Sequence, residues 1–202
     1  MYHRPVDFLL LLPLALVALW MARARQQQRR IAILARYLSG HDIEKNIGTL
    51  SQGYSRALGE SDPALSEQVW DALRGTEDVL CRQVRKLAED FAGVEPTATR
   101  VSKFPIWLPR SPALDRSFDM REALRMHARG ICRAVEEQGA SPKDRAFAIL
   151  AEMLLMQHTC HWYCRSKSVA SARMLAGHRT SHEQLEGAVL PQTRQENLEL
   201  VA

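Results

Sequence analysis

The chain has 202 residues, a formal net charge of +4 and four cysteines. This length suits one folded domain beyond any terminal segment. Six arginines and one acid fall in residues 1–36, which leaves 21 basic and 22 acidic residues in 37–202. A nearly neutral domain offers no broad surface for phosphates, so the charge distribution argues against nucleic acid as a partner.

An apolar run over residues 8–22 dominates the start of the chain. A typical membrane-spanning helix needs about 20 apolar residues. Residues 6–22 supply 17, or a little more if Tyr2 and the stem of Arg23 lie at the interfaces, which is short but sufficient. We therefore predict that residues 1–38 form a membrane anchor and a basic stalk. The anchor prediction rests on Phe8, Leu12, Leu16, Trp20, Arg23, Arg25, Arg29 and Arg30.

Three alternatives compete with the anchor: a cleaved signal peptide, an interfacial helix and a buried core helix. A signal peptide carries its positive charge before the apolar run, whereas most of the charge here follows it. An interfacial helix needs a polar face, which this run lacks. The arginines after the run predict a single-pass inner-membrane protein with its N-terminus outside and residues 23–202 in the cytoplasm, and Arg4 opposes this orientation only weakly.

The cysteines fit a reducing compartment. Cys81 and Cys132 are solitary, and Cys160 and Cys164 lie four residues apart in a helical context. This spacing is a poor disulfide framework, so we expect reduced thiols.

Apolar residues recur at spacings of three and four through most of the remaining chain, which predicts amphipathic helices. Capping residues and prolines mark three of the helix starts, at Asp62-Pro63, Asp119 and Ser141-Pro142. We expect helices over residues 43–58, 63–93, 119–139, 142–166 (with an extension to 175 as the alternative) and 181–190.

The predicted fold class is all-α, because the short apolar runs are flanked by helix formers and none is predicted as a strand. Four prolines in residues 94–117 exclude a continuous helix there. We expect a single N-terminal transmembrane helix followed by a four- to five-helix cytoplasmic bundle with a proline-rich crossover. The domain boundaries follow as 1–38 for anchor and stalk, 39–190 for the helical domain, and 191–202 for a polar tail.

An apolar cluster in the crossover comprises Phe104, Ile106, Trp107 and Leu108. It is too apolar for a free linker. Either these side chains pack the crossover onto the bundle, or they form an exposed docking epitope for another subunit.

Cys160, His161 and Cys164 form the densest group of reactive side chains, on one side of a predicted helix. A tetrahedral zinc site needs a fourth ligand, and His127 on the preceding helix is the candidate. The alternative is that the cysteines are small buried hydrophobes in the core.

A row of arginines four residues apart lies on the helix predicted over 119–139, at Arg121, Arg125, Arg129 and Arg133. Three interpretations are open: a solvated helix face, a surface for an acidic partner or lipid headgroups, and neutralisation by acids of the 63–93 helix.

No phosphate loop, dinucleotide-binding glycine pattern, nucleophile elbow or His-Glu-x-x-His motif occurs. We predict a non-enzymatic accessory or adaptor subunit of a larger membrane assembly, such as a secretion, conjugation or envelope machine. Its partners would be the lipid bilayer and other protein subunits, without a cofactor. The alternatives are a membrane-anchored thiol or metal sensor using Cys160, His161 and Cys164, with zinc as the metal, and an enzyme with a scattered site.

Overall fold

The computed structural model describes residues 6–103, 116–137 and 139–201, with the backbone alone for 6–10. Within these residues it comprises nine helices and one pair of short strands. The all-α prediction is therefore confirmed.

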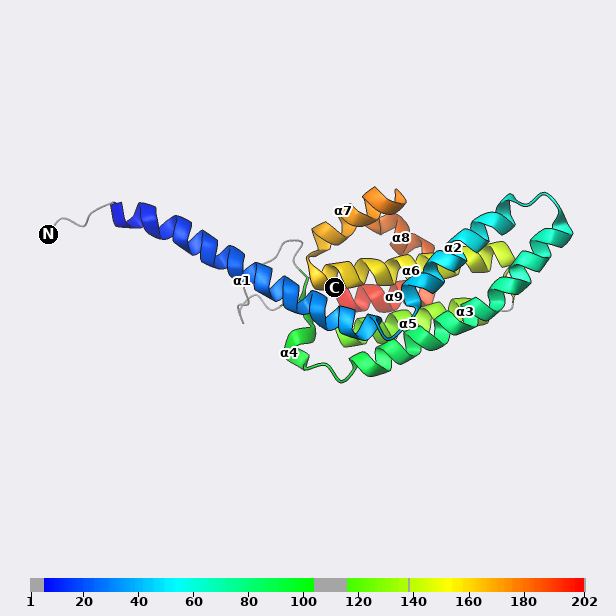
Figure 1. The fold of residues 1–202 in the computed structure, drawn as a ribbon, viewed down its shortest axis with the longest axis horizontal. Coiled ribbons are helices and arrows are strands. Elements are labelled where there is room, and N and C mark those ends of the chain that lie inside the picture. The colour runs from blue at the N-terminus through cyan, green and yellow to red at the C-terminus, as the bar shows by residue number, and fades with distance from the viewer. Residues whose placement is uncertain (1–5, 104–115, 138, 202) are drawn as a thin grey trace.

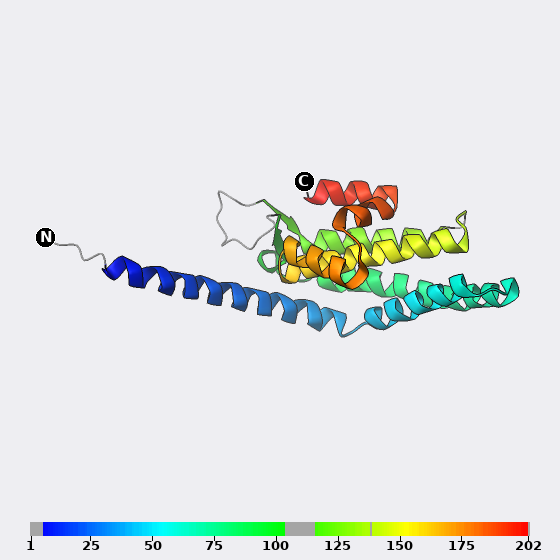
Figure 2. The same ribbon diagram turned by 90° about the horizontal axis from the view of Figure 1, so that it is seen from above.

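Helix α1 (Val6–Leu38) is 33 residues long, or about 50 Å at 1.5 Å per residue. Its first part projects away from the other helices, and its second part lies along them (Figures 1 and 2). Gln27 and Leu34 are buried at this junction. The helix ends at Leu38, the last residue of the predicted anchor and stalk.

Helices α2 (Ile43–Gly59) and α3 (Pro63–Phe91) form a long hairpin that extends beyond the neighbouring helices (Figure 1). The Asp62 side chain accepts a hydrogen bond from the Ala64 amide, which caps α3 as its sequence predicted. Gly53 permits the close approach of the two helices, because a Cβ at this position would overlap the Leu73 side chain.

Residues 94–119 contain a short helix, α4 (Pro96–Thr99), and two strands that the sequence did not predict. Strands β1 (Arg100–Ser102) and β2 (Ser117–Asp119) pair antiparallel, with Val101 opposite Phe118. Three-residue strands are too short to show a periodicity of two, so only their pairing reveals them. The apolar crossover cluster, which comprises Phe104, Ile106, Trp107 and Leu108, lies outside the described residues.

Helices α5 (Met120–Glu136) and α6 (Pro142–Cys164) begin at the predicted caps, where Asp119 and Ser141 accept backbone hydrogen bonds. Helix α6 does not continue to residue 175, because Arg165 leaves the helical conformation. The hydroxyl of Ser166 then caps a separate helix, α7 (Lys167–His178).

The C-terminal residues are ordered as helices α8 (His182–Ala188) and α9 (Pro191–Val201). The polar tail predicted over 191–202 is thus mostly a helix that packs on α5. Its buried residues are Thr193 and Asn197. The partly buried Leu200 and Val201 pack on the core only at the end of the helix. No apolar stripe therefore runs along its sequence, which explains the missed helix.

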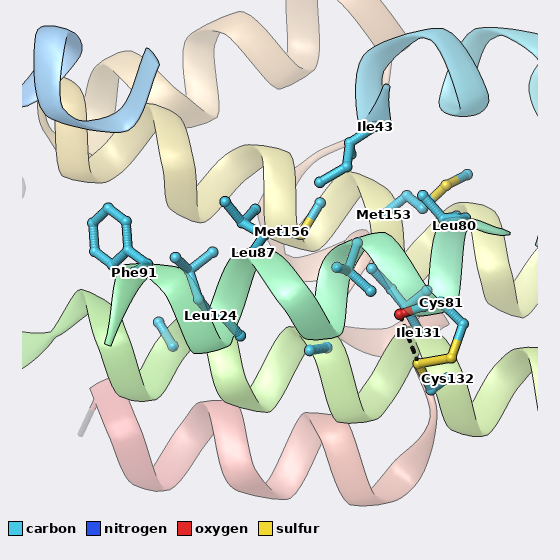
Figure 3. Close-up of a cluster of buried hydrophobic side chains, with 14 of the residues drawn as sticks. Ile43, Leu80, Cys81, Leu87, Phe91, Leu124, Ile131, Cys132, Met153 and Met156 are labelled. Atoms are coloured by element: carbon cyan, nitrogen blue, oxygen red, sulfur yellow. Dashed lines mark hydrogen bonds between the residues drawn. A yellow bond between two sulfur atoms is a disulfide. The ribbon is translucent and has the colours of Figure 1, made fainter. Parts of the chain in front are cut away.

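The main core lies between α2, α3, α5 and α6 (Figure 3). Its larger members include Ile43, Leu80, Leu87, Phe91, Leu124 and Met153. A second, smaller cluster joins α6 to α7 and α8 through Leu155, Met174, Leu185 and Val189.

A disulfide joins Cys81 of α3 to Cys132 of α5, with 5.0 Å between the two Cα atoms (Figure 3). The prediction that these two cysteines are solitary and reduced is therefore wrong. They are 51 residues apart in the chain, and only the packing of α3 against α5 brings them together.

Candidate functional site

The part of α1 that projects from the bundle is apolar on all sides. Its eight large apolar side chains are each between 41% and 68% exposed, and they are Leu11, Leu12, Leu14, Leu16, Val17, Leu19, Trp20 and Met21. We call residues 11–22 the arm. Such a large apolar surface marks contact with a membrane or with another protein.

Among the residues that the structure describes, no helix has the length and apolarity to span a membrane. The side chain of Phe8, which the anchor prediction includes, lies outside the described residues.

One of the arginines after the arm, Arg30, joins α1 to the bundle. Arg30 donates a hydrogen bond to the Tyr163 carbonyl oxygen at 3.0 Å and another to the Arg100 carbonyl oxygen, and its guanidinium lies 5.3 Å from the Tyr163 ring centre. Arg25 and Arg29 are exposed, and Arg23 is half-buried. One of the four flanking arginines therefore has a structural role in the bundle.

Each arginine of the α5 row has a carboxylate partner within the fold. Arg121 pairs with Asp119 and Arg125 with Glu122, while Arg129 and Arg133 share Glu196 of α9. The acids that neutralise the row come from residues 119–122 and from α9, and none of these three acids belongs to α3. The pairs are partly exposed, so each is worth little to stability.

A groove of about 400 Å³ runs between α3 and α5. Arginines and glutamates both line it, over a floor that includes Ala88 and Ala128. The ion pair between Arg85 and Glu136, 2.7 Å long, crosses from one helix to the other. With charges of both signs, the groove does not favour an anionic partner.

The proposed zinc ligands do not converge on one point. Cys164 lines a pocket with Leu34 of α1 and Ile43 of α2. Burial lowers the pKa of His161, and the charge of Arg173 on α7 lowers this pKa further. Among the described residues, no three His, Cys, Asp or Glu side chains are grouped to hold a metal ion.

The remaining candidate ligands have other environments. His127 is fully buried and shares a hydrogen bond of 2.9 Å with the Thr159 hydroxyl, and burial lowers its pKa to about 3. Burial also raises the pKa of the Cys160 thiol to about 12. A neutral imidazole and a protonated thiol are suited to packing rather than to thiol chemistry.

Two histidines that the sequence did not connect, one on α6 and one at the start of α8, lie together in the fold. The rings of His158 and His182 stack at 4.2 Å, and His158 Nε2 lies 3.1 Å from the Ser171 hydroxyl. Burial, followed by the charge of His182, lowers the pKa of His158 to about 3. No sequence signal could have paired these rings, because α7 separates them along the chain.

Two buried glutamates have different partners. Glu77 accepts a hydrogen bond of 2.7 Å from the Tyr54 hydroxyl and lies 3.4 Å from the Arg145 guanidinium. Glu152 accepts a bond of 3.0 Å from the Leu190 amide. Burial raises the pKa of Glu152 to about 7, and neither the hydrogen bond from the Leu190 amide nor the charge of Arg133 offsets the loss of solvent.

Comparisons with protein-family models, with curated proteins and with solved structures give no match for this chain.

Proposed function

We propose that this chain is a single-pass membrane protein whose helical bundle acts as an accessory or adaptor subunit of a larger membrane assembly. The observation that carries the proposal is the exposed apolar arm. Burying one large apolar side chain is worth about 1.5–3 kcal/mol, so eight exposed ones favour an apolar environment strongly.

A bilayer suits the arm better than a protein groove does. A helix that docks in a groove is apolar on one stripe, whereas the described side chains of the arm are apolar all round. Arginines follow directly at Arg23 and Arg25, where the headgroups of an inner membrane would lie.

The adaptor role is supported by the shape of the bundle. The closed end of the α2–α3 hairpin lies at the end of the molecule opposite the arm (Figure 1). It exposes two leucines there, Leu58 at 54% and Leu65 at 47%. A partner away from the membrane could reach this end without contacting the arm.

Fractionation tests the membrane attachment. We expect the full chain to stay in the membrane pellet after extraction at high pH, and a Leu12→Glu, Leu16→Glu variant to be released. The matched control is Leu58→Glu, which adds charge at another exposed leucine. Release of the unsubstituted chain would contradict the anchor.

Crosslinking in detergent extracts tests the adaptor role. We expect the unsubstituted chain to be crosslinked to defined membrane-protein subunits, and Leu58→Ser with Leu65→Ser to lose them. Leu198→Ser, at an exposed position of α9, is the control. Equal recovery of crosslinked subunits with all three chains would contradict docking at the hairpin. The crossover variant Trp107→Ala, Leu108→Ala is then the next test.

No specific observation favours the thiol- or metal-sensor alternative, so no second function is proposed.

A further inference from the structure

The disulfide between Cys81 and Cys132 lies inside the folded bundle. Cys81 is 5% exposed and Cys132 is 1% exposed. Cys81 on α3 and Cys132 on α5 both belong to the main hydrophobic cluster, together with residues such as Leu80 and Ile131. Neither an oxidant nor a reductant can reach a bond at this depth without opening of the bundle.

This burial fixes when the bond forms. The two thiols must be oxidised while the chain folds, before α3 and α5 close over them. Reducing systems of the cytoplasm keep the thiols of a folding chain reduced, whereas extracytoplasmic compartments oxidise them. The compartment in which the bundle folds therefore decides whether the bond exists.

We propose that the bundle is oxidised at Cys81 and Cys132 in the cell and therefore lies on the non-cytoplasmic side of the membrane. This orientation is the reverse of the one that the flanking arginines predict. The orientation rests on the proposed membrane attachment, whereas the oxidation of the two cysteines does not depend on that attachment.

The chemistry is a disulfide exchange with a protein disulfide oxidant. The thiolate of one cysteine attacks the oxidant's disulfide, forms a mixed disulfide and releases one oxidant thiolate. The second cysteine, as a thiolate, then attacks the sulfur of the first, which forms the Cys81–Cys132 bond and releases the other oxidant thiolate. Two electrons pass to the oxidant, and the two protons leave with its reduced thiols.

The arginines do not outweigh this observation. The charge rule counts basic residues near the end of a span, so the four flanking arginines oppose this orientation, but long domains cross a membrane largely regardless of their own charge. The bundle is such a domain. Arg30, one of the four flanking arginines, also has a role in the fold through its bonds to Tyr163 and Arg100.

The other two cysteines make a quantitative test simple. Cys160 and Cys164 are unpaired, so the oxidised chain has two free thiols among its four cysteines. Cells expressing the full chain are quenched in acid, denatured and treated with a maleimide mass tag, before and after reduction. We expect two tags before reduction and four after it.

Two variants assign the tags. Cys81→Ala with Cys132→Ala should carry two tags under both conditions, and Cys160→Ser with Cys164→Ser should carry none before reduction and two after. Four tags on the unsubstituted chain before reduction would overturn the proposal. So would a disulfide that persists in cells lacking the oxidant of the extracytoplasmic compartment.

A reporter fused after Ala202 tests the side independently. An enzyme that is active only when oxidised should be active in this fusion, and a fluorescent protein that matures only in the cytoplasm should be dark. The opposite pair of results would overturn the orientation. The intact mass of the chain separates this inference from the proposed function: an active reporter on a chain shortened near Ala22 would keep the oxidised bundle and remove the anchor.

Discussion

Two contacts of α5 hold the bundle together by different means. Its contact with α3 is apolar and covalent, with the Cys81–Cys132 disulfide beside Leu80 and Ile131. The other face of α5 meets α9 through polar groups, among them the pair of arginines that share Glu196. Glu152 of α6 also takes part in this second contact, because its carboxylate accepts a hydrogen bond from the Leu190 amide just before α9.

The difference predicts how each contact responds to solution conditions. Reductant cleaves a buried disulfide when the bundle opens or unfolds, and the bond itself carries no titrating group. A buried carboxyl responds to pH and not to reductant. Each of the following changes should affect one contact and leave the other intact.

The largest effect is expected from removing the disulfide. Closing a loop of 51 residues stabilises the folded chain by about 4 kcal/mol in the chain-entropy account. Cys81→Ala with Cys132→Ala should lower the free energy of unfolding by about this amount, measured with denaturant. Reductant should then have no further effect on the free energy of unfolding of this variant. Cys160→Ala with Cys164→Ala is the control, and it should keep the response to reductant.

The next largest effect concerns the charge of Glu152. Its pKa is raised by burial from 4.5 to about 7, so the folded chain holds this proton more tightly than the unfolded chain does. The stability that this proton contributes is complete below pH 4.5 and is lost as the pH rises towards 7, by about 3 kcal/mol. Glu152→Gln should remove this loss, so the variant should gain stability relative to the unsubstituted chain as the pH rises.

The comparison between Glu152→Gln and the unsubstituted chain controls for neighbouring charges and for other titrating groups, because these are the same in both chains. Arg133 and Glu196 also act on Glu152, with opposite signs, and both remain in the variant. His127 and His158 have lowered pKa values, so they destabilise the fold as the pH falls below 6.5, but equally in both chains. Parallel pH profiles of the two chains would contradict the role given to Glu152.

A smaller effect is expected at Gly130 of α5. A Cβ here would overlap the Glu152 carboxylate and the Thr193 hydroxyl. Overpacking costs about 2 kcal/mol, and the helix preference of alanine over glycine offsets about 1 kcal/mol of this. Gly130→Ala should therefore lower thermal stability modestly. Gly75→Ala in α3, which has open space around it, should raise stability instead.

The smallest effect is expected from the exposed ion pairs between α9 and α5. Glu196→Ala removes the partner of Arg129 and Arg133, and such surface pairs are worth less than about 1 kcal/mol each. The loss should shrink further in concentrated salt, which screens surface charges. A loss that is independent of salt would show that Glu196 acts through packing. Glu122→Ala provides a comparison within one helix.

The sequence by itself determined where most helices begin. Asp62, Asp119 and Ser141 cap α3, α5 and α6 at the predicted places, because a cap is a bond between residues two or three apart. The apolar character of the arm is equally a local property. These signals lie within one turn of chain, so no knowledge of the fold is needed to interpret them.

Only the tertiary structure decided which distant side chains meet. The Cys81–Cys132 bond, the stacked rings of His158 and His182, and the buried Glu152 depend on how helix faces far apart in the chain pack together. Helix α9 was missed for the same reason, since its buried contacts are polar and leave no apolar period. A residue's spacing in sequence predicts the face of the helix on which it lies, whereas the partner of that face depends on the packing of the whole core.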